Sequence, residues 1–130
     1  GMQALDAALD LFSDVDPGSL RRKSLALTAF FMQGVAAGTA LSDLQIVTPT
    51  PDDRRGSQVS LRHPEAYAIA QCLIAQGVIV DFRDPDIVRF GFAPLYNSFS
   101  DAAMAVEALL DALSTGAYRQ ARYRQRAQVT

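Results

Sequence analysis

The sequence predicts an α+β fold in which a small mixed or antiparallel sheet carries helices packed on one face. Segments with apolar residues at helical spacing alternate with short segments in which apolar and polar residues take turns. The order helix, helix, strand, strand, helix, strand, strand, helix lets one sheet face meet every helix. The composition fits one globular domain, since 49% of the 130 residues are hydrophobic and 20% are charged.

Two helices are predicted in the first third of the chain. Residues 3–12 place apolar side chains opposite Asp6 and Asp10, and the breaker-rich sequence SDVDPGS follows. Ser19 is the expected N-cap of a second, longer helix that ends around Gly38. The inward row of this helix is expected to be Leu20, Ser24, Leu27, Thr28, Phe31 and Val35.

Two half-buried strands and a third helix come next. The sequences DLQIVTP and SQVSLRH both alternate apolar and polar residues. Residues 48–57 between them are expected to form a loop, because Pro49 and Pro51 lack a backbone donor. Pro64 suits the first turn of a helix, and Gly77 suits its end. The inward residues of that helix are expected to be Tyr67, Ala70, Leu73 and Ile74.

Two further strands are predicted on either side of a turn at RDPD. The sequence VIVDF is apolar through its first part, which is typical of a central strand. In IVRFGFAP, the residues Val88, Phe90 and Phe92 alternate with Arg89 and Gly91. We therefore expect the three apolar residues to face the helices, and Arg89 and Gly91 to lie on the opposite sheet face, together with Gln58 and Ser60 of SQVSLRH.

A last long helix is predicted to begin after Ser98. Asp101 follows at the spacing of a capping box, and Gly116 provides a natural end. The sequence AYRQARYRQRAQVT is expected to continue as a polar helix. The inward row of the long helix is expected to be Val106, Leu109, Leu110 and Leu113.

Arg89 is the strongest candidate for a binding residue. Its place on the sheet face away from the helices, beside Gly91, which has no side chain, would form a small surface that can bind an anion. A planar guanidinium can grip a carboxylate through two parallel hydrogen bonds, and one charge-assisted bond contributes roughly 1.5–3 kcal/mol. Judged from the residues alone, a simpler alternative is favoured, in which Arg89 pairs at the surface with Asp84 or Asp86.

Several function classes receive no support from the composition. The net charge of −2 offers no global attraction to nucleic acid or to an anionic membrane, and no apolar run approaches the roughly 18 residues of a membrane helix. The single cysteine, Cys72, excludes an internal disulfide and a Cys-rich zinc site, so a cytoplasmic location is the default. We expect a buried, inert thiol. The arginines and tyrosines of the tail are interpreted as a solvated or contact surface, not as a nucleic-acid patch.

Three strings of the sequence resemble one enzyme family. RRGSQVSLRHP at 54–64, IVRFGFAPLYNSFSDAAMAVEAL at 87–109 and LRRKSLALTAFF at 20–31 resemble the C-terminal (small) domain of kynureninase. That family belongs to the aspartate-aminotransferase-like, fold-type-I enzymes that use pyridoxal phosphate. The resemblance runs in order along nearly the whole chain. Residues 2–130 are therefore expected to form one small domain of this kind, and Gly1 ahead of Met2 is read as a tag remnant.

The resemblance implies an activity and site residues. The complete enzyme would hydrolyse L-kynurenine, or its hydroxylated relative, to anthranilate (or the hydroxylated product) and L-alanine. Arg89 would bind the α-carboxylate of the substrate. Arg62, His63, Tyr96 and Asn97 match the same strings and are secondary candidates, although Tyr96 and Asn97 fit a structural turn and helix entry as well.

The resemblance also implies what this chain lacks. In the family, pyridoxal phosphate is held as a Schiff base on a lysine of the large domain, with an acidic partner for the ring nitrogen. The only lysine, Lys23, lies in the cation-rich string RRKS and does not resemble that lysine. We therefore expect no catalytic residue, no metal and no cofactor in this chain, and no activity without a partner.

The expected partner is a cofactor-binding large domain or a second subunit, and the expected ligand is a carboxylate-bearing amino acid. Neither nucleic acid nor a membrane is expected as a partner. Whether the chain is an excised domain or a truncated family member stays open at this point. The alternative function is a stand-alone, non-catalytic module that binds a small ligand or serves assembly and that derives from the same fold.

Overall fold

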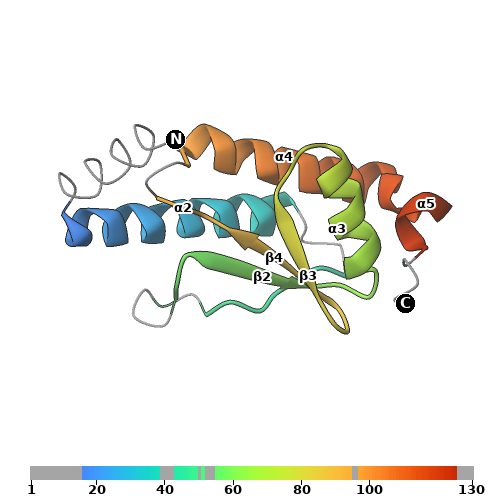
Figure 1. Ribbon diagram of the computed structural model, residues 1–130, viewed down its shortest axis with the longest axis horizontal. Coiled ribbons are helices and arrows are strands. Elements are labelled where there is room, and N and C mark those ends of the chain that lie inside the picture. Colours follow the sequence, from blue (N-terminus) through green and yellow to red (C-terminus); the bar gives the residue numbers. More distant parts are fainter. Residues whose placement is uncertain (1–15, 39–42, 50, 52–54, 95–96, 126–130) are drawn as a thin grey trace, which may run out of the picture.

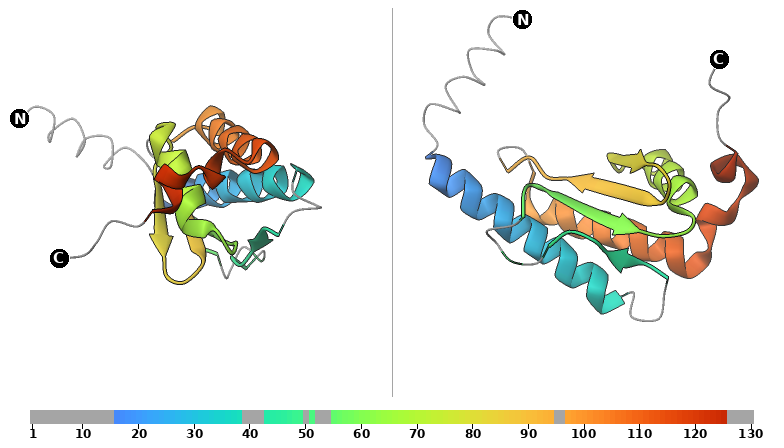
Figure 2. Two further views of the ribbon diagram at one scale, coloured as in Figure 1. Left: turned by 90° about the vertical axis from the view of Figure 1, so that its right-hand side faces the viewer. Right: turned by 90° about the horizontal axis from the view of Figure 1, so that it is seen from below.

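A four-stranded antiparallel sheet with a layer of helices on one face makes up the described part of the chain (Figure 1). The computed structural model describes residues 16–38, 43–49, 51, 55–94 and 97–125. Seen along the other axes, the long helices lie together on one side of the sheet (Figure 2). The predicted α+β class, with helices packed on one face of a small sheet, is confirmed, and the sheet is antiparallel throughout.

The sheet has the order β1–β2–β4–β3, so β2 and β4 occupy its centre. Its strands are β1 Gln45–Ile46, β2 Gln58–Arg62, β3 Val80–Arg83 and β4 Ile87–Gly91. The alternation predicted for the two central strands is confirmed. Val59 and Leu61 of β2 and Val88 and Phe90 of β4 are buried against the helices. The intervening residues of both strands lie on the other face.

The prediction that VIVDF forms a central strand is wrong. β3 is an edge strand that pairs with β4 alone in the described part of the sheet. Only part of the apolar run belongs to it, because Val78 and Ile79 precede the strand and Ile79 is 91% exposed. Val80 and Phe82 are partly buried and alternate with exposed residues. The run therefore has one buried face, as an edge strand over a helix layer requires.

Helix α2, Pro17–Gly38, is the longest in the described chain. It begins two residues before the predicted cap Ser19, because Pro17 occupies the first turn and Asp16 precedes it. The Asp16 carboxylate accepts a hydrogen bond from the Ser19 N–H at 3.2 Å, so Asp16, not Ser19, does the capping. The predicted inward row and the end at Gly38 hold, although Leu20 is only partly buried. The helix expected at 3–12 lies outside the described residues.

Helix α3, Ala66–Ala75, and helix α4, Phe99–Thr115, complete the layer. Ile74 was expected to point inward but is 48% exposed. The buried face of α3 is centred on Ile69 and Leu73, which turns Ile74 toward solvent. At the start of α4 the predicted capping box is present, with reciprocal hydrogen bonds between Ser98 and Asp101.

The end of α4 is fixed by Gly116, whose φ of 71° is left-handed and therefore suits glycine. The tail does not continue as one polar helix. It forms a short 3-10 turn, η2 Ala117–Arg119, and a short helix, α5 Ala121–Arg124, separated by the extended Gln120. Tyr118 and Tyr123 are buried at the end of the core, one in each of these two short elements.

Helices α2 and α4 approach each other closely at two glycines. A Cβ at Gly34 would lie 3.1 Å from both methyl carbons of Val106. A Cβ at Gly38 would lie 2.5 Å from the end of the Leu110 side chain. The two helices therefore pack at a distance that these glycines permit. Among the described helices, none has the length and apolar character needed to cross a bilayer.

Candidate functional site

Arg89 lies at the centre of the sheet face that the helices leave uncovered. It belongs to the central strand β4, opposite Ser60 of β2 on one side and Asp81 of β3 on the other. Its side chain is 24% exposed. Two residues along the strand, a Cβ at Gly91 would meet nothing within 4 Å. The predicted placement of Arg89 beside open space on the uncovered face is therefore observed.

The partner of Arg89 is Asp81, not Asp84 or Asp86 as expected. The Arg89 Nη2 donates to Asp81 Oδ2, and Arg83 Nε lies 3.4 Å from the same oxygen. The hydrogen bond from Arg89 lowers the pKa of the Asp81 carboxyl, and the charges of both arginines act in the same direction. Strand register explains the choice of partner, because Asp81 lies directly opposite Arg89, whereas Asp84 and Asp86 belong to the turn.

The guanidinium of Arg89 retains hydrogen-bonding capacity after this pairing. Asp81 accepts from one of the two terminal nitrogens. The Nε atom is buried and has no hydrogen-bond partner in the described structure. An arginine carries five N–H donors, so a carboxylate that arrives over the uncovered face can still be bound by the terminal nitrogens. Chemically, the arrangement is suited to binding a carboxylate.

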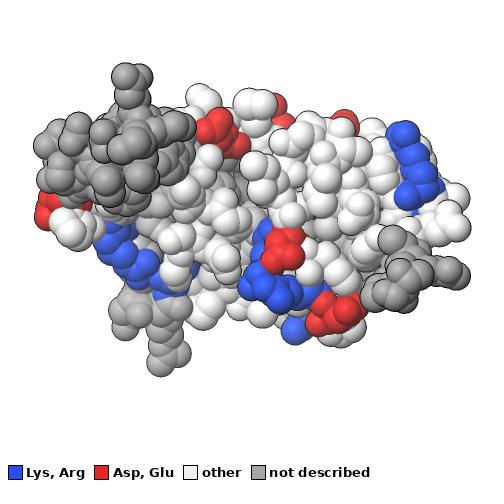
Figure 3. Space-filling model, viewed as in Figure 1, with Lys and Arg blue, Asp and Glu red and all other residues white. Residues whose placement is uncertain are grey.

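Arg62 is the one secondary candidate among the described residues that shares this face with Arg89. It lies on β2 opposite Ile87, diagonally across from Arg89, and its side chain is about half exposed. Its Nε lies 3.5 Å from Asp86 Oδ2. Figure 3 shows basic and acidic side chains gathered over the β3–β4 hairpin, where these strands meet.

The remaining secondary candidates lie elsewhere. His63 is 5% exposed, its Nδ1 accepts the Glu65 N–H at 2.9 Å, and its ring meets that of Tyr118 edge-on. Burial lowers the pKa of His63. Asn97 Oδ1 accepts the Ala93 N–H at 2.7 Å, which closes the turn ahead of α4. Tyr96 lies outside the described residues.

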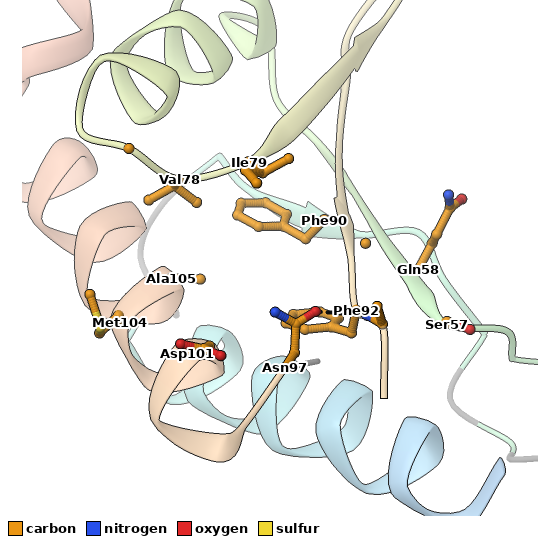
Figure 4. Close-up of a pocket in the computed structure, with 13 residues that line it drawn as sticks. Ser57, Gln58, Val78, Ile79, Phe90, Phe92, Asn97, Asp101, Met104 and Ala105 are labelled. Atoms are coloured by element: carbon orange, nitrogen blue, oxygen red, sulfur yellow. Dashed lines mark hydrogen bonds between the residues drawn. The ribbon is translucent and has the colours of Figure 1, made fainter. Parts of the chain in front are cut away.

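A hollow of about 630 Å³ lies beside the end of β4 and the start of α4 (Figure 4). Its walls are mainly apolar, and Asn97 and Asp101 contribute polar groups. The ring of Phe90 projects into it from β4 and that of Phe92 from just after the strand, while Val78, Ile79 and Met104 close the other sides. Arg89 is not part of its lining, but Gln58 and Gly91 are, so the hollow borders the uncovered sheet face at the end of β4.

Arg55 is a buried arginine in the segment for which a loop is predicted. It is 4% exposed, and its Nε donates to Thr28 Oγ1 at 2.7 Å while its Nη2 donates to the Leu25 carbonyl at 2.9 Å. These bonds fasten the loop to α2. The sequence feature that could have predicted a buried partner is Thr28, because a hydroxyl on the inward row of a helix needs hydrogen-bond partners.

Lys23, the only lysine of the sequence, lies on α2, where its charge helps to lower the pKa of Asp101 after the larger effect of the Ser98 hydrogen bonds. Lys23 is not among the residues that line the hollow. No group of three or more potential metal ligands occurs in the described part of the chain.

Residues 20–109 match the sequence model of the family described as Kynureninase C-terminal domain. The chain belongs to this family. The match includes the four strands, α3 and most of α2 and α4, and with them Arg89 and its partner Asp81. The resemblance drawn from the three sequence strings is thereby confirmed.

Whole kynureninases are similar to this domain over nearly its full length. Kynureninases of Burkholderia mallei (strain SAVP1) and Burkholderia pseudomallei (strain K96243) are each 47% identical over 129 residues, which is 99% of this chain and 31% of each relative. The kynureninase of Pseudomonas fluorescens is 46% identical over 126 residues, 97% of this chain and 30% of the relative. The chain thus spans less than a third of these relatives.

A solved structure supports the fold. A NifS-like protein superposes with a TM-score of 0.62 over 75% of this chain and 29% of its own, at 15% sequence identity. At that identity the likeness concerns the fold alone. It agrees with the expected similarity to the small domain of aminotransferase-like enzymes.

Proposed function

We propose that this chain is the small-domain portion of a kynureninase-like, pyridoxal-phosphate-dependent hydrolase. The complete enzyme would convert L-kynurenine and water to anthranilate and L-alanine. Arg89 would bind the α-carboxylate of the substrate. The observation that carries this proposal is an arginine with spare donors at the centre of an uncovered sheet face, in a domain that matches 31% of whole kynureninases.

The role of this chain would be to bind and orient, because the cofactor would be held by the remaining part of the enzyme. Pyridoxal phosphate, where it is bound, supplies an electron sink for the bonds at the substrate Cα. Bidentate hydrogen bonding of the carboxylate by Arg89 would fix the orientation of the rest of the amino acid. Arg62, on the same face, would add positive charge without direct contact.

A domain exchange tests the proposal. The matching C-terminal 31% of the Burkholderia pseudomallei kynureninase is replaced by this chain, and hydrolysis of kynurenine is followed. We expect the exchanged enzyme to be active and Arg89→Ala to raise KM by about tenfold to a hundredfold, the equivalent of a lost charge-assisted hydrogen bond.

The matched control is Arg122→Ala, which removes an exposed arginine from α5 in the helix layer. Its KM is expected to stay within about twofold of the unsubstituted chimera. An unchanged KM in Arg89→Ala would contradict the carboxylate role. A folded but inactive chimera would instead favour the alternative, a stand-alone binding or assembly module.

A further inference from the structure

We infer that Asp81 is a positioning residue for Arg89, and that it holds the guanidinium across the uncovered sheet face in the place where a ligand carboxylate is bound. This inference rests on the proposed role of Arg89 and assigns a function to a residue of the edge strand. Asp81 would not touch the substrate. It would act through the one hydrogen bond that it accepts from Arg89.

The strand register gives the pair its geometry. Asp81 and Arg89 are directly opposed on β3 and β4, and both lie on the uncovered face. The aspartate side chain is short, so a guanidinium bonded to it must lie close to the sheet surface. The observed burial agrees, since the Arg89 side chain is only 24% exposed and its Nε is buried. Without Asp81, the long side chain would be free to extend into solvent.

A carboxylate beside Arg89 raises the question of competition with an anionic ligand, and two observations favour positioning. Asp81 occupies a single nitrogen of the guanidinium. Its charge is also offset by Arg83, whose Nε lies 3.4 Å from the same oxygen. Among the described residues of this face, Arg62, Arg83 and Arg89 outnumber the two aspartates with which they pair, so an anion is still attracted. The net effect of Asp81 is therefore to order the Arg89 side chain before the ligand arrives, which reduces the entropy lost on binding.

The Asp81–Arg89 pair is insensitive to pH changes in the neutral range. Its main hydrogen bond lowers the pKa of Asp81, so the carboxylate is ionised throughout the neutral range. The positioning effect is therefore expected to be constant near pH 7.

The test uses the chimeric enzyme and separates geometry from charge. Asp81→Ala removes the acceptor, and we expect KM for kynurenine to rise about fivefold to tenfold with kcat within about twofold. Asp81→Asn keeps an acceptor oxygen at the same place and should recover most of the loss. Glu107→Ala removes an exposed carboxylate from α4, in the helix layer, and serves as the matched control.

A double substitution distinguishes positioning from a general loss of stability. If Asp81 acts only through Arg89, then Arg89→Ala with Asp81→Ala should have the same KM as Arg89→Ala alone. Independent, additive effects on KM would overturn the inference. A lower KM in Asp81→Ala or Asp81→Asn would identify a competitor and would also overturn it, as would an unchanged KM in Asp81→Ala.

The same data show which of the two proposals fails. If Arg89→Ala raises KM and Asp81→Ala does not, only the inferred positioning role of Asp81 is wrong. If Arg89→Ala leaves KM unchanged, the proposed function and this inference are both wrong.

A second measurement uses the 130-residue chain itself and does not depend on the chimera. Nitrogen-15 relaxation of the Arg89 Nε–H is expected to give a rigid order parameter that falls below about 0.6 in Asp81→Ala, with most of the order restored in Asp81→Asn. Equal order in the Ala variant and in the unsubstituted chain would overturn the inference.

Discussion

Two arginines, Arg55 and Arg89, carry the same side chain in opposite settings. Arg55 is 4% exposed and donates to a hydroxyl and a backbone carbonyl of α2. Arg89 lies on the uncovered sheet face, donates from one nitrogen to a solvent-exposed aspartate and keeps other donors unspent. The hydrogen-bond partners of an arginine, and not its presence in an apolar stretch, therefore indicate whether it serves the fold or a ligand.

The comparison extends to the polar groups around each arginine. On the helix-covered side, Thr28 and His63 are buried and bonded to neighbours within the domain. On the uncovered side, Asp81 and Arg83 are exposed. We therefore expect substitutions on the covered side to change the free energy of unfolding, and substitutions on the uncovered side to change ligand binding.

The largest effect on stability is expected from Arg55→Ala. It leaves the Leu25 carbonyl and the Thr28 hydroxyl without their charged donor, and we expect the free energy of unfolding to fall by about 3 kcal/mol. Urea denaturation of the chain measures this. Arg83→Ala on the exposed edge strand is the control and should change it by no more than about 0.5 kcal/mol. Equal effects for the two arginines would contradict a role of Arg55 in holding the fold together.

A smaller effect is expected from Thr28→Val, which keeps the shape of the side chain but removes the acceptor for Arg55 Nε. We expect a loss of about 1–2 kcal/mol in urea denaturation, because a buried donor is left unpaired. Combined with Arg55→Ala, the loss should be less than the sum of the two, since both substitutions remove one interaction. Strict additivity would show that the two side chains are not coupled.

His63 predicts a pH dependence of stability on the covered side. Burial lowers the pKa of the folded His63, so below its ordinary value of 6.5 the unfolded chain binds the proton first. The free energy of unfolding should therefore fall as the pH drops from 7 to 5. His63→Gln should remove this slope, because the sequence contains no other histidine. A slope that survives the substitution would contradict the assignment.

The smallest effect on stability is expected from Arg89→Ala, whose partner is exposed to solvent. We expect the free energy of unfolding to change by no more than about 0.5 kcal/mol, while substrate binding in the chimera weakens strongly. Urea denaturation and steady-state kinetics of the same variant provide the two values. A large loss of stability would place Arg89 in the same class as Arg55.

Local features of the fold were predictable from the sequence because they depend on neighbouring residues. Alternation places Arg89 on the correct face, and the Ser98–Asp101 spacing identifies the start of α4. The helix cap at Asp16 was missed because Ser19, three residues on, is also a residue type that favours the N-cap position. Only Pro17, which suits the first turn of a helix, distinguishes the two positions.

Features that depend on distant pairing were not predictable in this way. The edge position of β3 follows from strand order, and the choice of Asp81 as the partner of Arg89 follows from register. Neither is encoded in the spacing within a single segment. Arg55 was missed for the same reason, because its partners lie 27 and 30 residues away on α2.

The glycines between α2 and α4 limit how this domain can be recombined with its relatives. Gly34 faces Val106 and Gly38 faces Leu110, so each small residue has a bulky counterpart some 70 positions later in the chain. In a chimera whose junction lies between the two helices, the two members of each pair would come from different proteins. A larger residue at position 34 would then collide with the stiff branched side chain of Val106. Exchanges that transfer both helices as one block keep the matched surfaces together.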